Sequence, residues 1–426
     1  MSVVAIPMDE KKMLPKDWRW ARLGDVIREV QAGFACGERD PEGIAQLRMN
    51  NLDTRGNFVW DEVLRVPEPG NKIEPYLLLP GDVLFNNTNS TELVGKSAMF
   101  AGYSERIVYS NHFTRLRANS ALLLPEILSN WLILQWHEGT FAAICNKWIG
   151  QSAVKADKLL NLEMPLPPLP EQRRIAEVLR EQMAAVDKAR AAAQARLEAV
   201  RALPAAFLRQ VFGDEPAFAA SPVTPDRPVQ AGWTWHRLTD IARLATGHTP
   251  SRYHPEYWKG DIPWLQLADI RELDGQEAQD TSEHTNILGL ENSAAVLLPK
   301  GTVCLSRTAS VGFFAIMGRP MATSQDFVNW VCSDNLDPWF LMYLLIANRK
   351  RIRDLGSGAV HHTIYFPTVQ SFSVCAPPIK EQRRIAGFLR DALAGVEKAR
   401  VAADEELRAI NALPAALLHR AFRGKA

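Results

Sequence analysis

The segment Ser90–Ser97 comes nearest to a catalytic motif in this chain of 426 residues. It nearly matches the phosphate-binding loop G-x-x-x-x-G-K-S, in which backbone amides and a lysine surround the phosphates of a nucleotide. Ser90 stands where that loop needs its first glycine, and the second half of the chain has no matching segment. We therefore expect no nucleotide site here.

Other motifs with a known chemistry are also missing. The chain has no Asn/Asp-Pro-Pro-aromatic motif of an amino-methyltransferase, no G-x-S-x-G and no H-E-x-x-H. His361-His362 has no carboxylate or cysteine at ligand spacing, which favours a surface role over a metal site. We expect no catalytic residue, no metal site and no cofactor bound by this chain.

Short polar loops remain, and their side chains suit hydrogen bonds to the edges of bases. Asparagine can pair with adenine, and lysine or arginine can bind guanine or phosphate. A solvated loop or an Asx turn is the alternative for each residue taken singly. The candidates in the first half are Arg48, Asn50, Asn51, Asn86, Asn87, Thr88, Asn89, Lys96, Lys147, Gln151 and Lys155. Those in the second half are His248, Thr249, Arg252, Gln266, Arg307, His361, His362 and Thr363.

Composition places limits on these hypotheses. The net charge is +1, which argues against a basic, non-specific nucleic-acid binder, so any such contact must come from local patches. The five cysteines are scattered and form no C-x-x-C, as is typical of reduced thiols in a cytoplasm. The longest apolar run, 339–347, is too short to cross a bilayer. We expect a soluble, cytoplasmic protein with no membrane partner.

The elements that must position the loops occur twice. Residues 171–212 and 381–422 are identical at 24 of 42 aligned positions, and the two copies lie 210 residues apart. The motif W-x-W-x-R-L-x-D also occurs twice, beginning at Trp18 and at Trp233. Between these landmarks the offset drifts from 214 to 220, so the intervening regions have diverged while the repeated segments kept their length. The duplication predicts two similar domains, each followed by a long helix.

Apolar residues recur along each repeated segment at helical spacing. They form one seam per helix, and the two helices are expected to pack antiparallel as a spacer with a domain at each end. Amphipathic helices within ordinary cores are the alternative. Pro204 and Pro414 occupy the same place in each copy and predict a kink or a restart. The seam residues are Ile175, Leu179, Val186, Leu197, Val200, Ile385, Leu389, Val396, Leu407 and Ile410.

The predicted fold is therefore α+β, with two mixed domains, two long antiparallel, coiled-coil-like helices and an internal pseudo-two-fold repeat. The expected segments are residues 1–165 and 214–375 for the domains, with residues 166–213 and 376–426 for the helices. A linker rich in proline and alanine joins the halves at 212–231.

Several of these segments resemble one known family, the specificity subunits of type I restriction-modification systems. Residues 166–176 and 376–386 are similar to the P-x-x-E-Q-x-x-I segments that open that family's helices. Asn86–Lys96, Gly247–Ser251 and Tyr257–Trp264 are also similar to segments of that family. Asn87 is a departure, because relatives often carry arginine there.

The resemblance implies two target-recognition domains, each of which reads one half of a bipartite site in double-stranded DNA, with helices that fix the gap. It implies two modification subunits that dock on the helices and bring S-adenosylmethionine for adenine-N6 methylation. Restriction subunits, with ATP and Mg, would complete the complex. A self-sufficient nuclease or methyltransferase and a coiled-coil adaptor without DNA contact are the alternatives.

Overall fold

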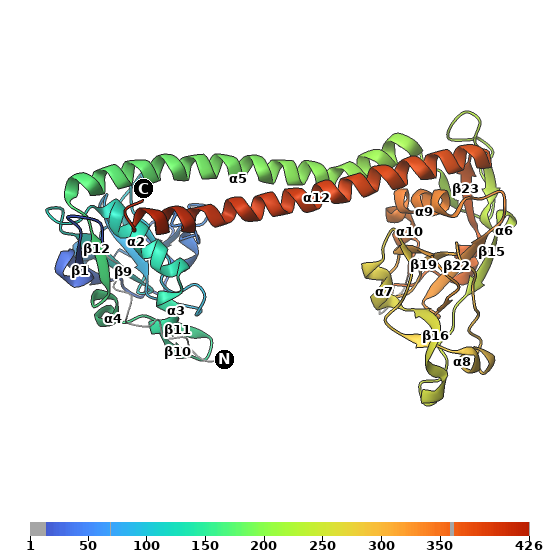
Figure 1. Cartoon of the computed structure of the whole chain (residues 1–426), viewed down its shortest axis with the longest axis horizontal. Coiled ribbons are helices and arrows are strands. Elements are labelled where there is room, and N and C mark those ends of the chain that lie inside the picture. Colours follow the sequence, from blue (N-terminus) through green and yellow to red (C-terminus); the bar gives the residue numbers. More distant parts are fainter. Residues whose placement is uncertain (1–13, 69, 358–361, 426) are drawn as a thin grey trace. The chain divides into compact units, whose positions relative to one another are not determined.

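The computed structural model describes residues 14–68, 70–357 and 362–425, and the chain divides into two compact units (Figure 1). Unit 1 comprises residues 1–194 and 405–426, and unit 2 comprises residues 195–404. Each unit contains one mixed α/β domain and parts of both long helices, α5 (Leu169–Phe212) and α12 (Ile379–Ala421). The predicted segment limits remain a prediction, since the compact units cut through both helices.

The domain of unit 1 is built around an antiparallel sheet with the strand order β2-β9-β5-β7. Val83, Leu84 and Phe85 of the central strand are fully buried, as expected for a short apolar run covered on both faces. Helix α2 (Pro125–His137) packs against this sheet through Ile127, Leu128 and other buried residues. The strands are β2 (Ile27–Ala32), β9 (Phe113–Ala118), β5 (Val83–Asn86) and β7 (Ser97–Met99).

Three smaller sheets complete unit 1. The sheet β4-β3-β8 contains a parallel pair, β3 and β8, and the sheet β10-β11-β6 forms a protruding hairpin with one added strand. The antiparallel pair β1 and β12 leads directly into α5. The strands are β4 (Leu64–Val66), β3 (Ile44–Leu47), β8 (Ile107–Tyr109), β10 (Asn146–Trp148), β11 (Gln151–Ala153), β6 (Thr88–Asn89), β1 (Arg19–Arg22) and β12 (Glu163–Leu166).

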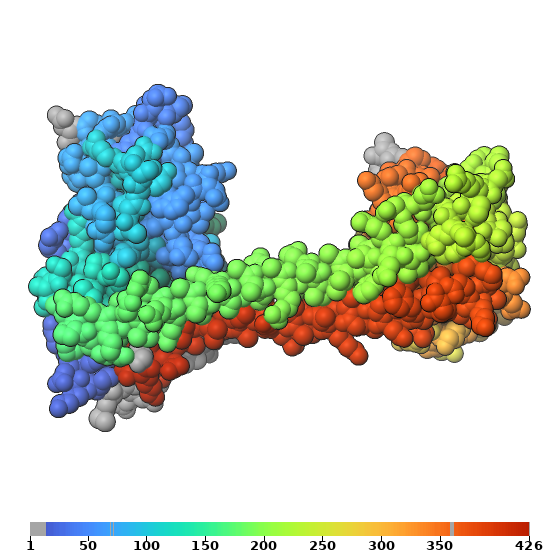
Figure 2. Space-filling model, turned by 90° about the horizontal axis from the view of Figure 1, so that it is seen from above, coloured from blue at the N-terminus to red at the C-terminus, as the bar shows by residue number. Residues whose placement is uncertain are grey.

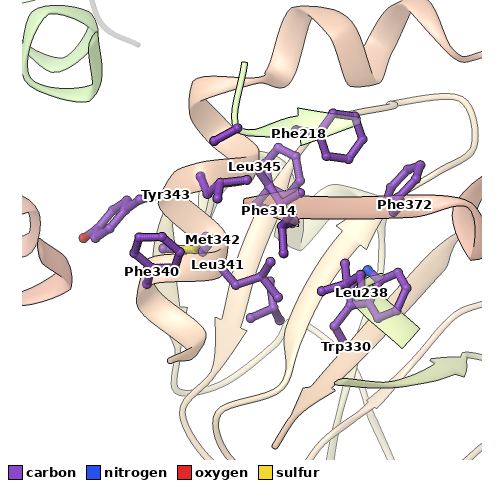
Figure 3. Packing of buried hydrophobic residues seen from close by; sticks show 14 of the residues in the cluster. Phe218, Leu238, Phe314, Trp330, Phe340, Leu341, Met342, Tyr343, Leu345 and Phe372 are labelled. Carbon is purple, nitrogen blue, oxygen red and sulfur yellow. The ribbon is translucent and has the colours of Figure 1, made fainter. Parts of the chain in front are cut away.

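Unit 2 repeats this plan. Its main sheet has the order β15-β22-β19-β20-β17, and β16 pairs in parallel with β21 as β3 does with β8. The apolar helix α9 (Pro338–Ala347) covers the sheet with Phe340, Leu341 and Leu345 (Figure 3). The strands are β15 (Ala242–Thr246), β22 (Phe327–Cys332), β19 (Val303–Ser306), β20 (Phe314–Met317), β17 (Gln276–Ala278), β16 (Trp258–Leu265) and β21 (Ala322–Thr323).

A further sheet, β13-β23-β14, leads into α12. Its strands are β13 (Phe218–Ala220), β23 (Phe372–Ala376) and β14 (Thr234–Arg237). The matching strand orders and the matching parallel pairs confirm the predicted duplication.

The long helices pair antiparallel within each unit (Figure 2). In unit 1, Arg190 Nε donates to Asn411 Oδ1 at 2.8 Å. In unit 2, the rings of Phe207 and Phe388 meet at a centroid distance of 6.1 Å. The numbering rises along α5 as it falls along α12, so the predicted antiparallel pairing is confirmed.

Seam positions of both helices lie away from solvent. Leu179 and Leu389 are 1% and 0% exposed, and Val186 and Val396 are 6% and 8% exposed. Val200, Leu407 and Ile410 are half-buried. Burial of this apolar stripe is what holds two otherwise polar helices together.

Neither helix restarts at its proline, so that part of the expectation is wrong. Pro204 and Pro414 lie inside continuous helices. A proline in a helix interior removes one hydrogen bond and crowds the preceding turn. Packing beyond each proline offsets that cost, because Phe212 is buried in the core of unit 2 and Leu418 in the core of unit 1.

One buried glutamine attaches each helix to its domain. Gln172 is 0% exposed, its amide nitrogen donates to the carbonyls of Leu122 and Pro167 at 2.8 and 2.9 Å, and its oxygen accepts from Leu124 N at 2.9 Å.

Gln382 makes the same three bonds in unit 2. Its amide nitrogen donates to Asn335 O and Pro377 O at 3.1 and 2.9 Å, and its oxygen accepts from Asp337 N at 2.9 Å. This glutamine of the repeated E-Q-R-R-I-A segment is therefore a joint between helix and domain.

No helix among the residues that the structure describes is long and apolar enough to span a membrane.

Candidate nucleic-acid interface

The predicted polar residues of unit 1 gather where β3 and β5 end and on the β10–β11 hairpin. Strand β6 pairs with β11, with Thr88 opposite Ala153 and Asn89 opposite Ser152. Asn87 O also accepts a hydrogen bond from Val154 N at 2.9 Å. The pairing brings the asparagine tract 86–89 and the hairpin together, although more than 50 residues separate them in the sequence.

Two of the predicted residues lie inside the domain. Asn51 is 2% exposed, and its amide donates to Val59 O at 3.0 Å and Glu62 O at 2.8 Å. Lys96 is 7% exposed, and its ammonium donates to Leu52 O. Burial lowers the pKa of Lys96. Both side chains hold the turn that contains Asn50, which is itself exposed.

Asn86 also has an internal role. It is fully buried, and its amide donates to His112 O at 2.9 Å and Thr88 O at 3.1 Å. Its side-chain oxygen accepts from Asn89 Nδ2 at 2.7 Å. Asn86 therefore shapes the loop from within, and the half-buried residues after it are the ones placed nearer to solvent.

Asn87 and Thr88 form a hydrogen-bonded pair at the loop surface. Thr88 Oγ1 donates to Asn87 Oδ1 at 2.7 Å, and Asn87 Nδ2 donates to Thr114 Oγ1 at 3.0 Å. These bonds fix the orientation of the Asn87 amide. Asn87 Nδ2 also donates to Asn111 O at 3.2 Å, so both amide hydrogens are used within the domain and only Oδ1 keeps a lone pair for a donor group of a base.

A cationic group stands beside this loop. Arg48 is half-buried, and its guanidinium donates to Cys36 O at 3.2 Å. Burial and the nearby Arg39 lower the pKa of Arg48, and burial and Arg48 lower the pKa of His112. The sequence prediction included Arg48 but missed Arg39 and His112. Ser110–Phe113 aligns with Ser324–Phe327 of the second half, and this match was the available signal for His112.

The hairpin presents its predicted residues to solvent. Lys147, Gln151 and Lys155 are all exposed. Between them, at the turn, Trp148 and Ile149 are exposed as well. The sequence prediction named the polar residues of this hairpin and omitted the two apolar ones.

In unit 2 the predicted residues converge on Gln325, which the sequence prediction missed. Thr249 Oγ1 donates to Gln325 Oε1, and Arg307 Nη2 donates to Gln325 O at 3.2 Å. The loops that contain Thr249 and Arg307 are thus hydrogen-bonded to the turn before β22. His248 lies next to this point, where its backbone nitrogen donates to Thr323 O at 2.9 Å.

The last predicted loop of unit 2 also packs against the Arg307 segment. His362 is exposed, and its carbonyl accepts from Ala309 N at 3.1 Å. Thr363 bridges to Thr308 as a pair of β residues. His361 lies outside the described residues.

Arg252 and Gln266 are held next to β16, whose end adjoins the turn of Gln325, since Ser324 N donates to Leu265 O at 3.0 Å. The Arg252 guanidinium lies 3.8 Å from the centre of the Trp258 ring and forms an ion pair with Glu283. Gln266 caps the short helix α7 (Leu267–Glu272), and its amide donates to Ser282 Oγ at 3.0 Å. Arg252 is about half exposed, so one face of its guanidinium stacks while the side chain still reaches solvent.

The two loop systems are equivalent in detail. Val154 N donates to Asn87 O and Ile364 N donates to Arg307 O, both at 2.9 Å. Asn87 and Arg307 therefore occupy the same backbone position in the two domains and present different side chains. Arg48 and Gln266 form another such pair, since both precede a short helical turn that begins with a capping box.

A family comparison agrees with this duplicated geometry. Residues 15–194 and 230–402 match the family described as the type I restriction modification DNA specificity domain. The chain belongs to this family. The two matched stretches contain both loop systems and most of both long helices, so the family assignment covers the whole candidate interface.

Individual relatives are similar over most of their length. The putative type I restriction enzyme MjaX specificity subunit of Methanocaldococcus jannaschii is 24% identical over 405 residues, covering 88% of this chain and 87% of its own. The HindI specificity subunit of Haemophilus influenzae is 22% identical over 403 residues, covering 80% of this chain and 85% of its own.

Two solved structures share the fold. A chain from work on complex assembly and conformational transition of the type I R-M system has a TM-score of 0.74 at 23% identity, covering 97% of this chain and 100% of that chain. The HsdS subunit from Thermoanaerobacter tengcongensis has a TM-score of 0.62 at 21% identity, covering 98% and 99%.

Proposed function

We propose that this chain is the DNA specificity subunit of a type I restriction-modification complex. Each domain reads one half of a bipartite target, and the chain performs no catalysis of its own. One observation supports this above all others. The two domains present equivalent loops, fixed by equivalent backbone hydrogen bonds, and the loops differ in the side chains that they hold.

The differing side chains are of kinds that discriminate between bases. Arginine binds guanine through two hydrogen bonds, whereas asparagine and glutamine bind adenine in the same way. Asn87 in the first domain is equivalent to Arg307 in the second, and Arg48 is equivalent to Gln266. Two domains that share one fold but carry different side chains at equivalent positions are expected to read two different half-sites.

The paired helices have the second role in this proposal, which is to set the gap between half-sites and dock two modification subunits. Their 44 and 43 residues have kept the repeated sequence while the domains diverged. In the proposed complex, S-adenosylmethionine belongs to the modification subunits. Restriction subunits would use ATP and Mg. A complex of this kind works on chromosomal DNA, so we place it in the cytoplasm.

The test is to map methylated adenines in cells that express this chain with its modification subunits. We expect one bipartite motif with a fixed gap. Cells with the modification subunits but without this chain are the control and should show no such motif. Methylation by the purified chain alone would favour a self-sufficient enzyme. Assembly without any sequence-dependent DNA binding would favour an adaptor.

The Arg307→Asn variant sharpens this test. It gives the second domain the residue that the first domain has at the same backbone position. We expect the specificity to change in one half-site only, with a cost of about 1 to 3 kcal/mol for the original base there. An unchanged motif would show that Arg307 reads no base.

A further inference from the structure

The β10–β11 hairpin exposes two large apolar side chains at its tip. The Trp148 side chain is 59% exposed, and Ile149 is 106% exposed, more than any other large hydrophobic residue that the structure describes. Trp148 pairs with Gln151, so Ile149 and Gly150 alone make the turn. Gly150 has a φ of +78°, a backbone conformation that glycine adopts more easily than other residues. Isoleucine is not among the residues that turns favour, so turn formation does not explain why an isoleucine stands at position 149.

The base of the hairpin is firmly attached. Strand β11 pairs with β6, and Thr91 Oγ1 and Ser152 Oγ share a hydrogen bond of 2.8 Å. Lys158 Nζ donates to Ile144 O at 2.7 Å and to Asn146 Oδ1 at 3.2 Å, at the start of β10. The tip therefore projects from a fixed support, at the end of unit 1 away from α5 (Figure 1).

The surroundings of the tip favour a polyanion over an apolar protein surface. Lys147 and Lys155 are exposed on either side of it, and Lys158 follows. Asp157 is the one acid of the segment 144–158, and Glu92 interacts with Lys147. Next to the tip, Gln151 is exposed and suits a base edge, and the half-buried Thr88 and Asn89 pair with the strand that follows it.

The second half of the chain lacks these two side chains. Ala153 matches Thr363 on the second strand at an offset of 210, whereas their partners Asn146 and Ser357 differ by 211. Five residues rather than six therefore lie between the paired positions in the second half, and these residues, 358–362, include no tryptophan and no isoleucine. The apolar tip is thus a property of the first domain. The second half has small residues in the corresponding segment, so glycine and alanine are suitable replacements for Trp148 and Ile149.

On the basis of the proposed function, we propose that Trp148 and Ile149 insert into double-stranded DNA at the half-site that unit 1 reads, and unstack a base step there. Apolar wedges of this kind open base steps and bend the duplex, and an indole ring can stack on an exposed base. The lysines neutralise the phosphates on either side, and the exposed Gln151 lies against the bases next to the opened step. The ligand that we propose for the hairpin tip is duplex DNA.

The test uses the whole complex of chain and modification subunits on a duplex that contains the target defined by methylation mapping. 2-Aminopurine replaces one base at a time through and around the first half-site, because its fluorescence rises when it loses its stacking partners. The variants are Trp148→Ala, Ile149→Ala and the double change Trp148→Gly with Ile149→Ala, which introduces the residue types of Gly358 and Ala359 in the second half. Leu79→Ala is the matched control, since Leu79 is 53% exposed in the same unit and precedes β5 at the end opposite Asn86.

We expect a fluorescence rise at one step with the wild-type chain and with Leu79→Ala, and its loss with the tip variants. Specific affinity should fall on the order of tenfold with Trp148→Ala. Tip variants that keep both the signal and the affinity overturn the insertion while leaving the proposed function intact. Tip variants that no longer co-elute with the modification subunits would show a protein-docking surface and also overturn it. A wild-type complex that recognises no bipartite target refutes the proposed function itself.

Discussion

Replacing Gln172 or Gln382 by leucine is the sharpest perturbation that the structure offers for the joint between helix and domain. Each glutamine is almost completely buried, at 0% and 3% exposed, and makes three hydrogen bonds to backbone groups. Leucine has a similar volume but leaves two carbonyls and one amide without their partner. Each such group costs about 1 to 3 kcal/mol when it stays buried.

The expected loss of stability is therefore about 3 to 5 kcal/mol for either variant, allowing for partial relaxation of the loops. Urea unfolding followed by circular dichroism measures it, with amide hydrogen exchange to assign the loss to one unit. Gln194→Leu is the control, because Gln194 is exposed on the same helix as Gln172 and should change stability by less than about 0.5 kcal/mol. A loss below 1 kcal/mol for both buried glutamines would refute the view that they join helix to domain.

Three further predictions concern the helices and the core. Val396→Asp places a carboxylate at a seam position that is 8% exposed, and we expect insoluble or unassembled protein by size-exclusion chromatography; Val401→Asp, at an exposed position of the same helix, should assemble normally. Insertion of four residues into one helix adds about 6 Å along its axis, and methylation mapping should show a changed gap with both half-sites kept; altered half-sites with an unchanged gap would contradict the spacer role. Burial raises the pKa of Tyr343 to about 12 from a usual value of 10.0, so the neutral phenol stabilises unit 2 below pH 10 and this contribution is lost as the pH rises through 12. The free energy of unfolding, plotted against pH, should therefore diverge between wild type and Tyr343→Phe from pH 10 to 12. Parallel curves would show that the phenol does not titrate in that range.

The duplicated plan was readable from the sequence because it depends on patterns that are local or simply repeated. The apolar spacing of the seam predicts two helices, and the paired W-x-W-x-R-L-x-D motifs mark two domains. The strand orders of the two sheets confirm that plan. The prolines were misread in part, since local propensity at Pro204 and Pro414 was outweighed by the packing of the residues that follow them.

The candidate interface was readable only in outline. Asn51, Asn86 and Lys96 have the composition of a recognition loop, yet they lie inside the first domain and position the residues around them. His112 and Gln325 were missed, because each joins the site through a strand pairing or a loop contact with distant residues. Residue type indicates which side chains can form hydrogen bonds, but not whether their partners belong to the same chain.

The sequence by itself determined the repeat, the helices and the family of this chain, because each rests on residue order and spacing alone. Tertiary structure decided which polar groups face outward and which close the loops from within. It also placed the β10–β11 hairpin beside β6, where Ser152 and Ala153 pair with Asn89 and Thr88. Those outcomes depend on hydrogen bonds between β6 and β11, strands that are remote in the sequence, and no local pattern specifies such a pairing.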